Sequence, residues 1–560
     1  MLAAFGTKRY SCPHMITEGR ASQVADLQQQ GEALASTQRA SGLYQQPSQT
    51  LLDTLHAANE PQVLFSPTLE FIVFLDYIRY PSIAELAEPA VNLAGHCVNP
   101  RNNGPQRVPR FVRLRLKRME AEHEISVLLP HGARIGHPHW SPGGQSFVFT
   151  NTTTDAIELW LCDAATGHAR RLEGLRPNTV LGTPAAWLAD SSSLVVDLIP
   201  ESRGVGPLGP TTIAGPHVHE CSGRRHPTLG QRNLLSTPFD EAAFDYYLKS
   251  QLAIVDLTNS QLRLVGEPGI FPLVSPSPNG EFFLVVRIHR PYSNERPLSA
   301  FPRAVEIWDR SGRLIYKVAS LPVAEDVPRD GVSAAPREFS WHPLEPATLI
   351  WVEALDEGDP ERRVPHRDRV VTLVAPFTNP PHELIRTEYR FSSLRWTDLG
   401  THALLSEYDR VLRQRRAILV DVAQGTFTAT RVLWSHSIDD RYAHPGTPIC
   451  RALPNGRHAI CQHEDSIFVA GEGAMPTGKR PFLDRLCLKS LQTTRLFESN
   501  AKRYEEVTTL LARDGSSFIV RTESTDSAPN YAIRRISKGH RPDSRKRLNY
   551  KRRSRRACSN

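Results

Sequence analysis

The sequence lacks several features that would each point to a definite class of protein. Its 560 residues contain no apolar run approaching about 18 residues, so we expect no transmembrane helix. No G-x-S-x-G occurs, so the strained elbow that carries the nucleophile of an α/β-hydrolase is missing. No two of the eight cysteines have C-x-x-C spacing, which excludes zinc-knuckle and thioredoxin-type sites and suits a reducing compartment.

The two ends of the chain differ in composition from its body. Residues 1–46 lack an apolar h-region, are rich in Gln, Ala and Ser, and include the acids Glu18, Asp26 and Glu32, so we predict a disordered extension rather than a targeting peptide. Residues 534–556 hold twelve Lys or Arg and one acid. Without them the chain carries 55 basic and 58 acidic residues, so its formal charge of +8 belongs to the tail. Such a run can bind nucleic acid, but we favour a solvated, disordered end.

One turn phrase recurs along the body of the chain. It consists of an apolar or aromatic residue, Ser-Pro or a polar substitute, an Asp/Asn/Gly-Gly pair and then an apolar strand. Its copies begin at Ser66, Trp140, Trp187, Ser275, Trp341, Trp396, Leu453 and Leu511. Repetition at intervals of tens of residues is typical of propellers and solenoids.

Each phrase opens a strand, and hairpins of alternating apolar residues follow, as at Ile157–Asp163 and Ala304–Asp309. Crossover helices are missing, which argues against a parallel α/β sheet. We therefore predict an all-β fold: a β-propeller of four-stranded antiparallel blades over residues 47–532, with seven blades preferred and eight left open. Residues 533–560 are predicted to form the basic tail. Short helices are expected near Pro81 and near Arg232–Lys249, in insertions between strands.

Two local motifs resemble ligand-binding sites, but the residues around them argue against a bound ligand. Gly204–Gly209 matches G-x-G-x-x-G, but Pro207 interrupts it and no helix opens to receive a pyrophosphate. His217 and His219 would share one face of a strand, yet no distant pair of ligands completes a metal site. We predict neither a metal nor another cofactor.

Polar clusters follow the predicted first strand of several blades, where loops reach a rim or the central channel. Arginines there could bind substrate carboxylates in bidentate fashion, although ion pairs and hydrogen bonds between blades are the interpretation that we favour. We expect substrate gating, and no catalysis, from these candidates: Arg287, His289, Arg290, His366, Arg367, Asp409, Arg410 and Arg441.

Longer phrases resemble one known family. Leu129–Gly144, Val286–Ser293, Val352–Pro360, Val364–Val370, Leu405–Arg410, Arg480–Leu486 and Glu523–Tyr531 are similar to the glutamyl endopeptidases of the prolyl oligopeptidase family. The resemblance covers roughly residues 44–531. It implies serine peptidases that cleave after Glu, in which a propeller caps an α/β-hydrolase domain and admits peptides or unfolded segments. Members occur in bacteria and in the plastid stroma.

The resemblance stops near Tyr531, and every catalytic residue of the family lies beyond that point, so none is transferred to this chain. We therefore expect a non-catalytic, substrate-gating propeller, truncated by a frameshift, a premature stop or a mispredicted gene end and inactive alone. Its expected partners are peptide or unfolded protein and a hydrolase domain in trans, without membrane or nucleic acid. Its expected location is the cytoplasm, or the stroma in a plant or alga. A free-standing propeller scaffold that binds protein or nucleic acid is the alternative.

Overall fold

The computed structural model describes residues 47–57, 59–107, 111–207, 234–324, 327, 330–423, 426–536 and 542–547. The chain divides into two compact units, Met1–Asn59 and Glu60–Asn560. In the first unit the described residues form the helix α2 (Gln49–Leu55). The predicted N-terminal extension, residues 1–46, lies outside the described residues, as do His217 and His219. All strands lie in the second unit, and everything below concerns that unit.

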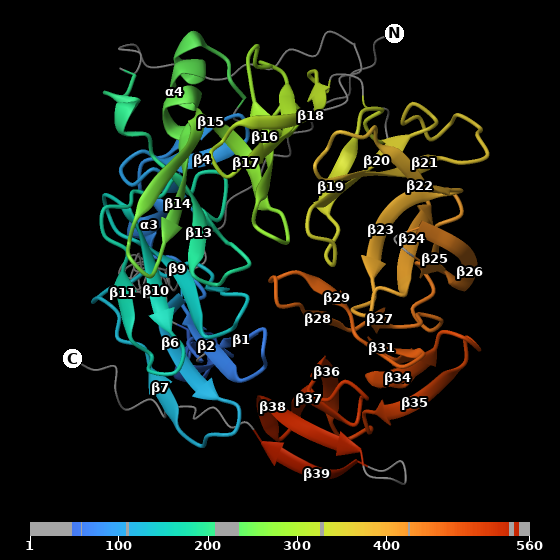
Figure 1. Cartoon of the computed structure of the whole chain (residues 1–560). Helices are drawn as coiled ribbons and strands as arrows, with labels where there is room; N and C mark the ends of the chain where they lie inside the picture. Colours follow the sequence, from blue (N-terminus) through green and yellow to red (C-terminus); the bar gives the residue numbers. More distant parts are fainter. Residues whose placement is uncertain are drawn as a thin grey trace, which may run out of the picture. The chain divides into compact units, whose positions relative to one another are not determined.

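The first four sheets follow one another around a common centre (Figure 1), and every strand pairing within them is antiparallel. Blades 3 and 4 share the long strand β15, whose first half pairs with β14 and whose second half pairs with β16. The strands of blade 1 are β1 (Gln62–Phe65), β2 (Phe71–Tyr77), β6 (Phe111–Arg118) and β7 (Glu124–Ser126); of blade 2, β8 (His139–Trp140), β9 (Ser146–Thr152), β10 (Ile157–Asp163) and β11 (Ala169–Arg171); of blade 3, β12 (Ala185–Trp187), β13 (Ser193–Leu198), β14 (Ser250–Asp256) and β15 (Leu262–Pro276); of blade 4, β16 (Phe282–Ile288), β17 (Arg303–Asp309) and β18 (Leu314–Leu321).

The second four sheets complete the circuit. The strands of blade 5 are β19 (Arg337–Trp341), β20 (Thr348–Ala354), β21 (Asp368–Val374) and β22 (His382–Thr387); of blade 6, β23 (Arg390–Trp396), β24 (His402–Asp409), β25 (Gln414–Ala423) and β26 (Thr426–Ser437); of blade 7, β27 (Thr447–Pro448), β31 (Ser466–Gly471), β34 (Phe482–Cys487) and β35 (Thr493–Glu498); of blade 8, β36 (Tyr504–Leu510), β37 (Ser517–Ser524), β38 (Ser527–Ile536) and β39 (Pro542–Arg547). The described residues thus form an all-β propeller of eight blades, the count that the sequence analysis had left open beside seven.

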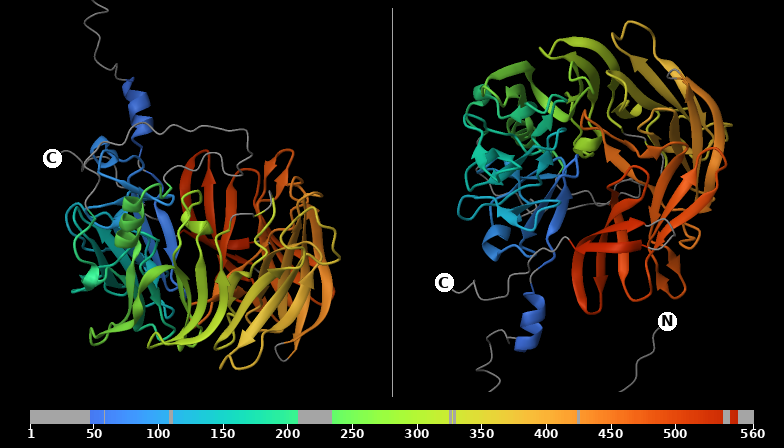
Figure 2. Two further views of the ribbon diagram at one scale, coloured as in Figure 1. Left: turned by 90° about the horizontal axis from the view of Figure 1, so that it is seen from above. Right: turned by 60° about the horizontal axis from the view of Figure 1, so that its bottom comes forward.

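Small elements lie between the main strands. They are α3 (Ile83–Leu86), β3 (Val91–Leu93), β4 (His96–Asn99) and β5 (Gly104–Pro105) in blade 1, the 3-10 turn η1 (Glu201–Arg203) and α4 (Pro238–Leu248) in blade 3, the 3-10 turn η2 (Leu298–Ala300) in blade 4, and β28 (Cys450–Ala452), β29 (His458–Ile460), β30 (Gln462–His463), β32 (Ala474–Met475) and β33 (Gly478–Lys479) in blade 7. The two helices fall in the predicted insertions, and each begins with a capping box, at Ser82 and Thr237. Figure 2 shows α4 at one end of the blade strands. No helix among the described residues is long and apolar enough to cross a bilayer.

The repeated phrase forms the same turn in most blades. A backbone N–H in the phrase donates to the carbonyl three residues earlier, as from Gly144 to Ser141 at 2.9 Å and from Gly280 to Ser277 at 2.8 Å. Both glycines have positive φ, 71° and 72°, which explains why glycine recurs at this point. The hydroxyl of Ser277 also accepts from the backbone N–H of Phe282 at 3.0 Å and so closes the loop.

In two copies of the phrase the tryptophan links one blade to the preceding one. Trp187 Nε1 in blade 3 donates to the His139 carbonyl in blade 2, and Trp341 Nε1 in blade 5 donates to the Ser275 carbonyl in blade 4, both at 2.9 Å. In these two copies the phrase therefore combines a turn with a tie between blades.

We expect Trp341→Phe to lower the free energy of unfolding by about 1–3 kcal/mol. The change removes the indole donor and leaves the Ser275 carbonyl without it. Denaturation in urea measures the effect. Trp351→Phe is the matched control, because that indole is equally buried but donates within its own strand, to Glu353 at 2.8 Å. If the two variants lose the same stability, the tie between blades contributes nothing of its own.

Among the described residues the circuit closes by packing, and the first and last blades exchange no strand. Blade 1 is built from the beginning of the unit and blade 8 from its end. Phe74 and Ile72 of β2 pack with Ile519 of β37 and Ile533 of β38 in one buried cluster. The last sheet extends beyond the boundary that we predicted at residue 532, because β38 continues to Ile536 and pairs with β39.

Candidate functional site in the central channel

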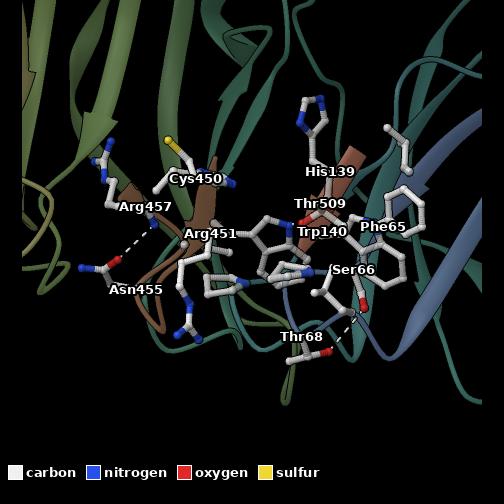
Figure 3. A pocket seen from close by; sticks show the side chains of 18 of the residues that line it. Phe65, Ser66, Thr68, His139, Trp140, Cys450, Arg451, Asn455, Arg457 and Thr509 are labelled. Carbon is white, nitrogen blue, oxygen red and sulfur yellow. Dashed lines mark hydrogen bonds between the residues drawn. The ribbon is translucent and has the colours of Figure 1, made fainter. Parts of the chain in front are cut away.

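The inner strands of six blades enclose a cavity of about 940 Å³. Its walls come from β1, β8, β12, β15, β28 and β36, and it extends to the turn phrases that follow several of these strands. This volume lies within the roughly 300–1,000 Å³ that is typical of ligand sites. Figure 3 shows side chains from distant parts of the sequence converging on it, among them Phe65, Trp140, Arg451 and Arg457.

One hairpin crosses the channel. In blade 7 the inner strand begins as β27, which pairs with β31, and then continues as β28, which pairs with β29 instead. We predicted that the phrase at Leu453 would open a strand. The phrase forms the tip of this hairpin and opens the short strand β29, and the second strand of the blade is β31, more than ten residues after the phrase begins.

The hairpin tip contacts three blades on the far side of the channel. Asn455 Nδ2 donates to the Pro343 carbonyl of blade 5 at 2.9 Å. Arg457 Nη2 donates to Ser275 Oγ of blade 4 at 3.2 Å and to the Pro276 carbonyl. At Gly456, whose φ is +79°, a Cβ would meet Pro142 Cγ of blade 2 at 3.1 Å, so glycine permits the close approach. The hairpin therefore bridges the channel and reduces its free cross-section.

The charged groups of the cavity wall are cationic. Its described lining contains Arg451, Arg457 and Arg513 but no Asp or Glu. Arg451 and Arg513 share one carboxylate behind the wall, that of Asp398, at 3.4 and 2.5 Å. Burial lowers the pKa of His139, with a further contribution from His137, and burial also lowers the pKa of His458. Both histidines are consequently neutral at pH 7, and the arginines set the charge of the wall.

The cavity wall lacks the parts of a serine or cysteine peptidase site. His139 Nε2 lies 3.3 Å from Thr183 Oγ1, but the described lining holds no carboxylate to orient the ring. Burial raises the pKa of Cys450, and burial together with the Asp398 charge raises the pKa of Cys461 to about 11. Both thiols are therefore protonated at neutral pH and poor nucleophiles.

The residues predicted to gate substrates lie elsewhere. Arg287 and Asp409 lie at the ends of the second strands β16 and β24, and the others lie on the loops that follow the second strands of blades 4, 5 and 6 or, for Arg441, before the inner strand of blade 7. Most are tied to neighbouring groups. Four arginines form ion pairs: Arg287 with Glu306 at 3.1 Å, Arg290 with Asp245 at 2.7 Å and with Glu241, Arg367 with Asp356 at 2.8 Å, and Arg410 with Asp330 at 2.5 Å. His289 Nδ1 lies 3.0 Å from the Arg290 carbonyl oxygen. The Asp409 carboxylate accepts a hydrogen bond from the Leu412 N–H at 2.8 Å.

His366 is partly exposed near the end of its loop, just before β21, and Arg441 lines a second cavity of about 530 Å³ between blades 7 and 8. None of the eight predicted residues lines the channel cavity. The sequence analysis missed Arg451, Arg457 and Arg513 because each lies in or beside a turn phrase, which we interpreted as structure alone. The sequence signal that could have pointed to the hairpin lies after Leu453, where the phrase is followed by only a short apolar run and then by a second turn at Glu464–Asp465.

Comparison with known proteins gives relatives for the propeller. No protein-family model matches the chain. The probable chloroplastic glutamyl endopeptidase of Oryza sativa subsp. japonica is 29% identical over 496 residues, which cover 84% of this chain and 52% of that protein. The protein of the same name in Arabidopsis thaliana is 30% identical over 498 residues, with 84% and 51% covered. The chain thus spans about half the length of the curated relatives it matches.

Solved structures are more distant. A chain from a study of two prolyl endopeptidases is 12% identical, covers 93% of this chain and 61% of its own length, and has a TM-score of 0.41. The β-propeller domain of the Trilobed protease from Pyrococcus furiosus is 9% identical, with 75% and 98% covered and a TM-score of 0.35. Because these identities and TM-scores are low, the propeller fold is established by the strand pairing of this chain and not by the solved structures.

The curated relatives match the propeller described above and the resemblance noted in the sequence, which is thereby confirmed. The chain is a β-propeller protein that is similar, over 84% of its length, to the glutamyl endopeptidases.

Proposed function

We propose that this chain is the substrate-gating propeller of a glutamyl-endopeptidase-like serine peptidase, and that its 560 residues select peptides without cutting them. The observation that carries the proposal is the channel cavity, which offers hydrogen-bond donors and aromatic walls but no set of nucleophile, base and acid among its described lining. The names of the rice and Arabidopsis relatives supply the reaction class.

The geometry favours extended peptide over folded protein. The bridging hairpin from blade 7 holds the tip residues Asn455 and Arg457 against blades 4 and 5, so the free cross-section is smaller than the ring of inner strands. A single extended segment fits a cavity of about 940 Å³, whereas a folded domain does not. A location in the cytoplasm or the stroma stays a prediction, supported by the chloroplastic names of the two relatives.

We expect the purified chain neither to react with a fluorophosphonate probe nor to cleave a Glu-containing peptide. The reason is that a fluorophosphonate needs an activated serine, and the sequence has no G-x-S-x-G. In-gel fluorescence after labelling and mass spectrometry of the peptide measure the two outcomes. A labelled band at the mass of the chain, or fragments ending in Glu, would show that the chain carries its own catalytic site.

A further inference from the structure

A smaller cavity lies between blades 3 and 4, beside the channel cavity. It has a volume of about 170 Å³, and its described walls come from β13, β14, β15 and the loop that precedes β12. Thr183, Leu273 and Val274 line both cavities, so the two adjoin. We call the smaller cavity the side pocket. Its volume suits a single side chain of a ligand that lies in the channel.

The side pocket contains the carboxylate of Asp197, near the end of β13. This strand reads Ser-Leu-Val-Val-Asp-Leu and is otherwise buried and apolar after its first residue. Because side chains alternate along a strand, Asp197 shares a face with Val195, which packs in an apolar cluster between blades 3 and 4. Residues that break a local pattern in this way are expected at functional sites.

No group in the described part of the chain compensates this carboxylate. Asp197 Oδ1 is buried and has no hydrogen-bond partner. Asn178 lines the same pocket, but its two amide N–H groups already donate to the carbonyls of Tyr247 and Lys249, at 3.0 and 3.1 Å. The described lining contains no Lys, Arg or His. Burial raises the pKa of Asp197 to about 7, with no hydrogen bond or charge from the described residues to offset it.

We propose that the side pocket binds the primary ammonium group of a peptide that lies in the channel, and that Asp197 supplies the counter-charge. An ammonium and a carboxylate form a charge-assisted hydrogen bond, roughly twice as strong as a neutral one. Ser250 is buried and lines the same pocket, so its hydroxyl can accept another of the ammonium N–H groups. A buried carboxylate without a partner is unfavourable until such a ligand compensates it.

The walls of the side pocket favour an alkylammonium over a metal ion. Asp197 is the one acid among the described lining, whereas a Ca²⁺ ion takes about six to eight oxygen ligands. A lysine side chain joins an ammonium to a flexible apolar stem, and the N-terminus of a peptide offers the same group without that stem. Apolar residues that would contact the stem are Leu181, Phe271, Pro272, Leu273 and Val274.

This inference rests on the proposed function, because it takes the ligand to be a peptide in the channel. It adds a positive charge on that peptide as a determinant of selection. The side pocket includes none of the eight residues that the sequence predicted to gate substrates.

The test measures peptide binding to the purified full chain by isothermal titration calorimetry at about pH 7.5, where the Asp197 carboxylate and a peptide ammonium are both mostly ionised. Three octapeptides are compared: one with a central Lys and blocked ends, one with norleucine in place of Lys, and the norleucine peptide with a free N-terminus. Blocked ends remove the terminal charges, and norleucine keeps the apolar stem without the ammonium. We expect the Lys peptide to bind about 10- to 100-fold more tightly than the blocked norleucine peptide, the range of a charged hydrogen bond. The third peptide tells whether a terminal ammonium serves as well as a side chain.

Variants assign the preference to the side pocket. Asp197→Asn should abolish the preference for the charged peptides and leave the affinity for the blocked norleucine peptide unchanged. Ser250→Ala should weaken the preference about 2- to 10-fold, the loss of one neutral hydrogen bond. Asp155→Asn is the matched control: it removes the same charge from an exposed position outside both cavities and should change nothing. Circular dichroism confirms that each variant is folded, and the affinity ratio of the unmodified chain gives an answer even if Asp197→Asn does not fold.

Equal affinity for all three peptides, or a preference for the charged peptides that survives Asp197→Asn, would overturn the inference. Either result leaves the proposed function standing, because an uncharged peptide would still be bound. Absence of binding by every peptide also overturns the inference. The proposed function is then tested by peptide cleavage in a chimera with the rice relative, which does not require measurable affinity of the isolated chain.

Discussion

Replacing Asp368 by alanine is expected to destabilise the propeller by about 3–5 kcal/mol, the cost of breaking a buried ion pair from one side. Asp368 is fully buried between blades 5 and 6. Its Oδ1 lies 2.8 Å from Arg337 Nη2 and accepts from Arg390 Nη1 at 2.6 Å, and its Oδ2 accepts from the Phe391 N–H at 2.7 Å. Alanine would leave the arginines buried opposite an empty space.

Asp356 extends this network. Arg390 Nη2 donates to it at 2.6 Å and Arg367 Nη1 at 2.8 Å, and its side chain is also fully buried. Burial alone would raise the pKa of Asp356, but the hydrogen bonds from Arg390 and Arg367 outweigh it and lower the pKa. The stability that Asp356 contributes is therefore present above its ordinary pKa of about 3.9 and is lost as the pH falls through the lowered folded-state value.

Guanidinium denaturation at pH 7 measures the effect of Asp368→Ala. The matched control is Asp155→Ala, which removes the carboxylate of an exposed pair with Arg101, whose two side chains are 77% and 51% exposed. Exposed pairs contribute about 0–1 kcal/mol, so the control should unfold at nearly the same denaturant concentration as the native chain. Equal midpoints for both variants would mean that water or a rearranged side chain compensates the arginines between blades 5 and 6.

Phe74→Ala is expected to cost about 3–5 kcal/mol, the range for deleting a buried phenylalanine from a packed core. Phe74 is fully buried in the cluster that joins blades 1 and 8. Since these blades exchange no strand within the part of the chain that the structure describes, apolar packing and the ion pair of Arg521 with Glu60, at 2.8 Å, hold the circuit closed there. The loss should therefore act on the closure itself.

Hydrogen exchange distinguishes this from general destabilisation. We expect faster exchange in β2, β37 and β38 of Phe74→Ala, with blades 3 to 6 much less affected. Leu314→Ala is the control, because it deletes an aliphatic side chain that is 49% exposed on β18. Uniform acceleration over all blades would contradict the view that the first and last blades meet at a separable, packed seam.

The sequence predicted the blades well because their signals are local. A residue with positive φ, a hydroxyl that closes the turn and an apolar strand all fit within about ten residues, as at Ser277–Ile288. The phrase at Leu453 carries the same local signals and forms the same turn, with Gly456 at positive φ. What differs is the path of the chain afterwards, which depends on contacts of Arg457 with residues about 180 positions away.

The candidate site was hidden from the sequence for the same reason. Polar residues after a strand could be identified, but their partners could not: Arg290 meets Asp245 on α4, and Arg410 meets Asp330, which lies between blades 4 and 5. An arginine paired with a carboxylate and one without a pair look alike in a sequence. Only the folded chain separates Arg451 and Arg513, which share Asp398, from Arg457, which binds uncharged acceptors.

The central claim, that this propeller gates peptide substrates, is tested most directly by a chimera. Residues 60–547 would replace the matching half of the rice relative, and cleavage of a short Glu-containing peptide would be compared with cleavage of a folded protein that contains exposed Glu residues. The unmatched half of the rice protein alone is the control. We predict that the chimera cleaves the peptide and spares the folded protein, and that the control, if active, cuts both. A chimera that cuts the folded protein as readily as the control would contradict the account.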